Sequence, residues 1–215
     1  HYGVTMFMTD RTMGPAALAR AVEERGLHSL YLPEHTHIPV SRSTPPPTGD
    51  AELKDEYKRT LDPLVALAIA AGVTDRILLG TGIALIAQRE PIVTAKAIAT
   101  LDRESQGRFV LGIGFGWNED ELEDHGFSMP QRRDVTRERM LAMRALWTQD
   151  VAEFHGEYVD LAPSWSWPKP YGAPERAGPP VLIGGAAGPK MFAHIAEYAD
   201  RSEEHTSELQ SRLHL

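Results

Sequence analysis

The residues best suited to chemistry follow a short apolar run, in the segment 33–37 (Pro-Glu-His-Thr-His). A histidine titrates near neutral pH, so His35 beside the carboxylate of Glu34 is suited to donate or accept a proton. Three interpretations of His35 stay open: contact with a cofactor or substrate, a loop histidine bonded to the backbone, or a metal ligand together with His37. No third metal ligand is evident nearby in the sequence.

Three glycine-rich segments follow other apolar runs. Segment 80–83 (Gly-Thr-Gly-Ile) continues a strand pattern, where glycine marks a bulge or the close approach of a ligand. Segment 112–118 begins like a dinucleotide-binding turn, but Trp117 occupies the place of the last required glycine. It is therefore either a tight turn or a surface that a flat ring or a phosphate approaches. Segment 184–189 enters a helix, where free N–H groups favour a phosphate, with an ordinary strand-to-helix turn as the alternative.

The elements that position these residues alternate along the chain. Continuous apolar runs, typical of parallel strands covered on both faces, predict strands at 3–8, 29–32, 77–85, 109–114 and 181–184. Prolines near helix starts predict helices after Gly14, Asp62, Glu90 and Gly188, and a further helix spans 132–147 with Met140 and Met143 in the core.

This alternation predicts an α/β fold with a parallel sheet, either an open doubly wound sheet or a (β/α)8 barrel. A barrel needs about 250 residues, and five parallel strands do not close one. We therefore predict a (β/α)8 TIM barrel truncated after about the fifth strand–helix unit. The long stretch 147–180 is typical of a lid or insertion, with a small hairpin at 154–158 and two tryptophans, Trp165 and Trp167, in a lid or packing role.

Composition narrows the class of protein. The 215 residues contain 22 Lys plus Arg against 30 Asp plus Glu and have no cysteine. An acidic chain is a poor partner for nucleic acid, and the missing cysteines exclude disulfides and thiolate chemistry. No run of about 18 apolar residues indicates a membrane span, and no Gly-x-Ser-x-Gly elbow indicates a hydrolase. We expect a cytoplasmic protein that acts on a small molecule.

The last residues differ in character from the rest. Segment 201–211 has no apolar periodicity and resembles the conceptual translation of a DNA-sequencing adapter. We therefore expect residues 1–200 to be the N-terminal part of one barrel domain, and residues 201–215 to be a non-native tail.

Taken together, the motifs 32–39, 79–84, 97–102, 107–118 and 139–147 resemble the luciferase-like monooxygenase superfamily, specifically its deazaflavin (coenzyme F420)-dependent oxidoreductases. The similarity extends from Tyr2 to about Asp200, and the Gly-Phe-Gly-Trp-Asn end of the fourth strand is its most characteristic part. It implies a (β/α)8 barrel that holds a flavin or deazaflavin ring at the carboxyl ends of its strands.

The resemblance also implies roles for individual residues. Glu34 and His35 match an acidic residue and a histidine near the reactive centre of the ring, and are the expected catalytic pair. Gly82 and Ile83 match a non-prolyl cis peptide behind the ring. Further cofactor contacts are expected at Gly114, Phe115, Gly116, Ala187, Gly188 and Pro189, and substrate contacts at Trp117, Trp165 and Trp167. Trp117 departs from relatives that place an acidic catalytic residue there.

The function that the resemblance implies is hydride transfer between coenzyme F420 and a small organic substrate, without a metal. Two alternatives stay open: a reduced-FMN monooxygenase that inserts oxygen from O2, and a non-enzymatic flavin-binding protein or inactive fragment. Activity is expected of the full-length parent rather than of the 215-residue chain. Relatives are commonly dimers, so a homodimer is an option, although no part of the sequence indicates its interface.

Overall fold

The computed structural model describes residues 2–46, 49 and 52–203. Its main sheet consists of β1 (Gly3–Thr5), β2 (Ser29–Leu32), β3 (Leu78–Thr81), β4 (Phe109–Ile113), β7 (Val181–Gly184) and β8 (Arg201–Glu203). The strands pair in the order β1-β2-β3-β4-β7-β8, and every pair is parallel. The predicted α/β fold with a parallel sheet is confirmed.

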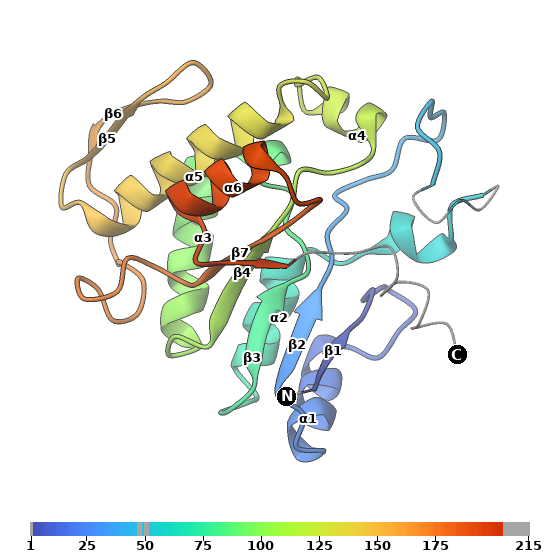
Figure 1. Ribbon diagram of the computed structural model, residues 1–215. Coiled ribbons are helices and arrows are strands. Elements are labelled where there is room, and N and C mark those ends of the chain that lie inside the picture. Colours follow the sequence, from blue (N-terminus) through green and yellow to red (C-terminus); the bar gives the residue numbers. More distant parts are fainter. Residues whose placement is uncertain (1, 47–48, 50–51, 204–215) are drawn as a thin grey trace.

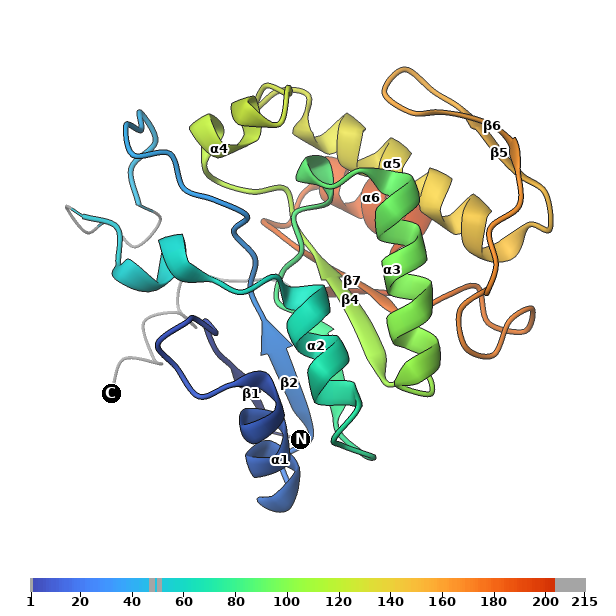
Figure 2. The ribbon, with the colours of Figure 1, turned by 180° about the vertical axis from the view of Figure 1, so that it is seen from behind.

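Helices connect the strands and cover one face of the sheet (Figures 1 and 2). They are α1 (Pro15–Glu24), α2 (Pro63–Ala71), α3 (Pro91–Glu104), α4 (Glu119–Asp124), α5 (Arg132–Thr148) and α6 (Pro189–Tyr198), with short 3-10 helices η1 (Asp55–Arg59) and η2 (Ile86–Gln88). None of the helices in the described part of the chain is long and apolar enough to cross a membrane.

The predicted proline starts are correct, and local chemistry explains two of them. The Asp62 side chain caps α2 by accepting a hydrogen bond from the Val65 N–H at 3.0 Å. Glu90 caps α3 through the N–H groups of Ile92 and Val93. Both caps satisfy backbone donors that the first turn of a helix leaves free.

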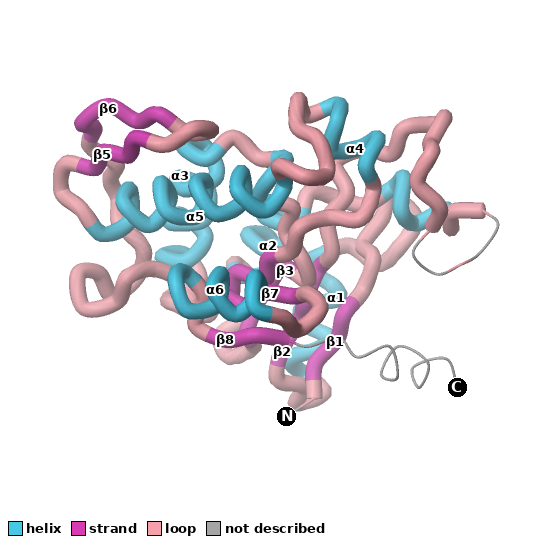
Figure 3. The backbone as a smooth tube through the Cα atoms, turned by 45° about the horizontal axis from the view of Figure 1, so that its top comes forward, coloured by secondary structure: helices cyan, strands magenta, loops and turns pink. Residues whose placement is uncertain are grey.

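A second, antiparallel sheet lies outside the main one. Strands β5 (Ala152–His155) and β6 (Asp160–Ser164) form a hairpin that packs along α5, as the segment 154–158 predicted. Figure 3 shows this hairpin at the end of α5 that is remote from α4.

Three predictions about strands were inexact. The third strand ends at Thr81 rather than at residue 85, because the chain turns at a cis peptide between Gly82 and Ile83 and then enters η2. The first strand ends at Thr5, which pairs with Tyr31 of β2, rather than at residue 8. A sixth strand, β8, was not predicted.

Strand β8 coincides with the first three residues of the predicted non-native tail. Its backbone pairs with Leu182–Gly184 of β7. Its three residues are polar and carry no apolar strand signal in the sequence, which is why the strand was not predicted. The rest of the tail, 204–215, lies outside the described residues, and its non-native origin stays a prediction.

The core lies between the sheet and the helices. Fully buried side chains from the strands meet fully buried side chains from α2, α3 and α5, among them Leu30, Leu79, Leu111, Ile113, Leu67, Ile98, Met140 and Met143. The predicted core position of the two methionines is confirmed.

Glycines allow β2, β3 and β4 to lie close together on the opposite, inner face. The ring of Tyr31 occupies the place that a Cβ at Gly80 would need. A Cβ at Gly112 would overlap the carbonyl oxygen of Thr81, whose hydroxyl donates to the Gly112 carbonyl at 2.6 Å.

Replacing Gly112 with alanine should therefore destabilise the sheet. We expect Gly112→Ala to lower the free energy of unfolding by about 1–3 kcal/mol, because a backbone oxygen blocks the new methyl group. Chemical denaturation measures the loss. Gly14→Ala is the matched control, since nothing lies within 4 Å of a Cβ at that position. Equal stability of the two variants would contradict the argument.

Candidate functional site at the carboxyl ends of the strands

His35 lies in the turn that follows β2, where its ring is paired with a carboxylate from a distant helix. Nδ1 of His35 lies 2.9 and 3.1 Å from the two carboxylate oxygens of Glu121 on α4. The pair is well shielded from solvent, with 7% of the His35 side chain and 1% of the Glu121 side chain exposed. A carboxylate bound to one ring nitrogen fixes the orientation of the imidazole.

Two aromatic rings lie against the ring of His35. The Tyr57 ring from η1 lies 5.3 Å away and the Trp117 ring after β4 lies 5.8 Å away, centroid to centroid. Tyr57 and Trp117 also meet edge to face, and Phe7 after β1 packs on Tyr57 at 4.8 Å. Segments after three different strands therefore build an apolar wall beside the histidine.

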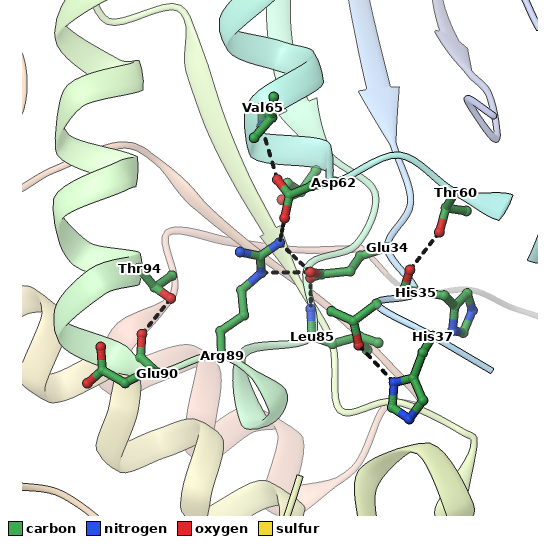
Figure 4. Close-up of polar contacts among 12 residues, drawn as sticks. Glu34, His35, His37, Thr60, Asp62, Val65, Leu85, Arg89, Glu90 and Thr94 are labelled. Atoms are coloured by element: carbon green, nitrogen blue, oxygen red, sulfur yellow. Dashed lines mark hydrogen bonds and ion pairs between the residues drawn. The ribbon is translucent and has the colours of Figure 1, made fainter. Parts of the chain in front are cut away.

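Glu34 faces away from His35 (Figure 4). Its buried carboxylate accepts hydrogen bonds from the Leu85 N–H at 2.7 Å and from Nε of Arg89 at 2.6 Å. Arg89 also donates to the carboxylate of Asp62 at 2.6 Å. These contacts join the turn after β2, the segment after β3 and the start of α2.

The ion cluster formed by Glu34, Arg89 and Asp62 affects ionisation. Burial acts to raise the pKa of Asp62, but the Val65 N–H and Arg89 outweigh it and hold that pKa below its usual range. Burial likewise opposes the charge of Arg89, yet Glu34 and Asp62 raise its pKa. Asp62 and Arg89 therefore both stay ionised at neutral pH.

A cavity of about 140 Å³ lies on the inner face beside the cis peptide of Gly82 and Ile83. Its other walls come from the central strands and their ends: Thr5, Tyr31, Thr81, Gly112, Leu182 and Gly184. Gly114 passes close to the Ile83 side chain, where a Cβ would not fit, and Gly116 has a φ of +74° that suits glycine. The wall of the cavity itself consists in part of glycine backbone, at Gly82, Gly112 and Gly184.

The predicted phosphate turn lies next to this cavity along the chain. Ala187 and Pro189 are exposed, Gly188 is half-buried, and α6 begins at Pro189. The first N–H groups of a helix favour an anion. Phe115, a predicted cofactor contact, is instead buried under the guanidinium of Arg133 at 4.3 Å and beside His194 at 5.3 Å.

Larger hollows occur elsewhere. One of about 440 Å³ lies near the amino ends of the strands, at Leu78, Gly107 and Val110. His35 follows the carboxyl end of β2, so this hollow lies toward the other end of the strands. In (β/α)8 barrels the chemistry takes place at the carboxyl ends of the strands. We therefore place the site at the smaller cavity.

The model of the family described as luciferase-like monooxygenase matches residues 14–203. This chain belongs to the luciferase-like monooxygenase family. It is 52% identical over 202 residues to the uncharacterized protein Rv0953c of Mycobacterium tuberculosis, covering 93% of this chain and 70% of the relative.

Two further luciferase-like relatives carry functional names. The F420-dependent hydroxymycolic acid dehydrogenase of M. tuberculosis is 28% identical, over 90% of this chain and 48% of its own length. The crystal structure of monooxygenase RslO1 from Streptomyces bottropensis matches with a TM-score of 0.70 and 27% identity, over 86% of this chain and 53% of that one. The chain spans about half the length of these two proteins.

Family membership agrees with the predicted barrel type, since the six strands follow one another in barrel order. The family includes F420-dependent oxidoreductases and monooxygenases. Among the described residues, no group of three or more His, Asp or Glu side chains is arranged to hold a metal ion.

The structure brings together some predicted site residues of this luciferase-like chain and separates others. His35, Trp117, Gly82 and Ile83 lie at the carboxyl ends of neighbouring strands. Trp165 and Trp167 do not join them. Both are largely exposed, and the carbonyl of Trp167 binds Lys96 on the outer side of α3. Their role in substrate binding stays a prediction, as do the roles of the other predicted residues.

Sequence reasoning missed three residues of this site, namely Tyr57, Arg89 and Glu121. Glu121 lies in the acidic run 119–121, which is typical of the first turn of any helix. Arg89 precedes Glu90 at the start of α3, where nothing in the sequence indicates an ion pair with Glu34.

Removing the charge of Arg89 should be costly. We expect Arg89→Met to lower the free energy of unfolding by about 3–5 kcal/mol, because it leaves the buried Glu34 carboxylate without its cation. Chemical denaturation at pH 7 measures this. Arg11→Met is the control, since Arg11 pairs with Asp55 at the exposed surface. Losses of the same size in both variants would show that burial of the Glu34 pair does not matter.

Proposed function

We propose that the protein is an F420-dependent oxidoreductase that transfers a hydride between the deazaflavin and a small alcohol or carbonyl compound. The observation that carries this proposal is the His35–Glu121 pair, a shielded acid–base group after β2, the strand whose end is bonded to Gly82 at the cis peptide. Similarity to the F420-dependent dehydrogenase of M. tuberculosis supports the choice of cofactor.

The residues present fit such a cofactor. The ring would lie against the Gly82–Ile83 peptide, in the cavity that Thr81, Gly112 and Gly184 also line. Its phosphate-bearing tail would reach the turn at Ala187, Gly188 and Pro189, where α6 begins. Bound there, the deazaflavin supplies two-electron hydride chemistry, and the protein supplies orientation and a proton carrier.

The residues of this chain have separate tasks in the proposed reaction. His35 takes the proton from a substrate hydroxyl or returns it to a carbonyl oxygen. Tyr57 and Trp117 exclude water from the reacting group and favour an apolar substrate. Glu34 holds the turn that carries His35 through its pair with Arg89.

We also propose that residues 1–200 form the N-terminal part of a longer barrel. The sheet has six parallel strands in consecutive order, and the solved relative RslO1 is about twice as long as the matched region. The proposed hydride transfer should therefore be measured in the protein encoded by the complete reading frame.

Replacing His35 should abolish proton transfer and leave binding intact. We expect His35→Ala to lower turnover about 10²- to 10⁴-fold, the usual contribution of general acid–base catalysis. F420 affinity, measured by the fluorescence of the cofactor, should not change. His155→Asn, on the exposed hairpin, is the control. Unchanged turnover in His35→Ala would overturn the proton role, and tight F420 binding without turnover of any alcohol or carbonyl tested would favour a binding protein.

Oxygen dependence separates the proposal from a reduced-FMN monooxygenase. Hydride transfer to or from a deazaflavin needs no oxygen, so turnover should be the same with and without air. An oxygen electrode should show no uptake during substrate conversion. Oxygen uptake that matches product formation and requires reduced FMN would replace the proposal with oxygen insertion.

A further inference from the structure

We propose that Glu121 is the positioning residue for His35: it holds a hydrogen on Nδ1 and so leaves Nε2 free to exchange a proton with the substrate. The inference rests on the proposed function for the reaction itself, but the state of the His35 ring is a property of the protein alone. Glu121 acts through His35 and does not touch the reacting atoms.

The geometry sets the tautomer. Both oxygens of the Glu121 carboxylate lie within 3.1 Å of Nδ1. An ionised carboxylate only accepts hydrogen bonds, so Nδ1 must carry the hydrogen that joins them. The lone pair of a neutral His35 then lies on Nε2. That nitrogen is left to act as the base.

Contacts on both sides of the pair hold this arrangement. The loop after β2, which carries His35, is bonded to α4, which carries Glu121. Asp120 accepts hydrogen bonds from the backbone and hydroxyl groups of Ser43 and Thr44, at 3.1 to 3.4 Å. Further along α4, the Asp124 carboxylate lies 2.9 Å from Nε2 of His37. The loop and α4 therefore position His35 and Glu121 as a unit.

The other ionisable groups near the pair come from three elements. Tyr57 on η1 faces the His35 ring. His125, just after α4, and His37 on the loop face each other, with ring centroids 5.5 Å apart. Burial, and then the neighbouring His37, lower the pKa of His125, so this ring is mainly neutral at pH 7. Glu34 is engaged by Arg89. In the described structure, Glu121 is thus the carboxylate that pairs with His35.

The reaction balances with this assignment. When an alcohol is oxidised, its carbon loses a hydride to the oxidised deazaflavin, which gains two electrons. The hydroxyl proton passes to Nε2 of His35, and the C–O bond becomes a carbonyl. Glu121 offsets the positive charge that the imidazole then carries, as carboxylates do behind catalytic histidines. In the reverse reaction the proton passes from Nε2 of His35 back to the carbonyl oxygen.

Kinetics of a charge-neutral variant test the proposal. We expect Glu121→Gln to lower kcat about 10- to 100-fold, typical of losing the partner of a functional histidine. Glu121→Asp should recover part of the rate. Glu123→Gln on the exposed side of α4 is the control, and equal losses in both variants with no recovery of the rate in Glu121→Asp would overturn the proposal.

Nitrogen-15 NMR of the cofactor-free protein gives a second readout. The expected spectrum shows His35 with its hydrogen on Nδ1, and a change of that signal in Glu121→Gln but not in Glu123→Gln. A hydrogen on Nε2 alone in the neutral wild-type ring would overturn the proposal even if the Gln variant failed to fold. The expected spectrum in a protein that does not turn over with F420 would instead refute the proposed function and support the pairing.

Discussion

The Arg89 guanidinium lies between the carboxylates of Glu34 and Asp62, and much of the site depends on this contact. Glu34 belongs to the turn after β2, Asp62 caps α2, and Arg89 follows η2 after β3. One cation therefore holds three segments at the carboxyl ends of neighbouring strands. A buried carboxylate such as that of Glu34 needs a cationic partner. The turn that contains Glu34 therefore depends on Arg89.

With that turn held, the chemical group is built from parts that are far apart in the chain. His35 projects from the loop after β2, and its carboxylate partner comes from α4, 86 residues away in sequence. Tyr57 and Trp117 close the apolar side. The low exposure of the pair matters for the proposed reaction, which needs a proton carrier of fixed orientation in a setting from which water is excluded. A loop histidine in solvent would have neither property.

The glycines on the inner face serve a different requirement. At Gly80 and Gly112 they admit a ring and a carbonyl from the neighbouring strand, which is a matter of packing. At Gly82 and Gly184 they also border the cavity beside the cis peptide. Glycine thus allows neighbouring strands to lie close together within the sheet, and it also leaves backbone exposed to the cavity at the end of the sheet. For this reason the glycine-rich strand ends, in the sequence alone, were consistent with either a bulge or a ligand-binding surface.

The sequence by itself determined the class of fold and the helix starts, and it offered His35 as a candidate. Apolar runs and capping residues such as Asp62 act over a few positions, so local physics suffices to predict them. It did not determine which carboxylate serves His35: Glu34, its neighbour in sequence, faces Arg89, and Glu121 takes its place. Nor did it place Trp167 on the outer side of α3. Such pairings depend on how distant segments pack, and only the tertiary structure decided them.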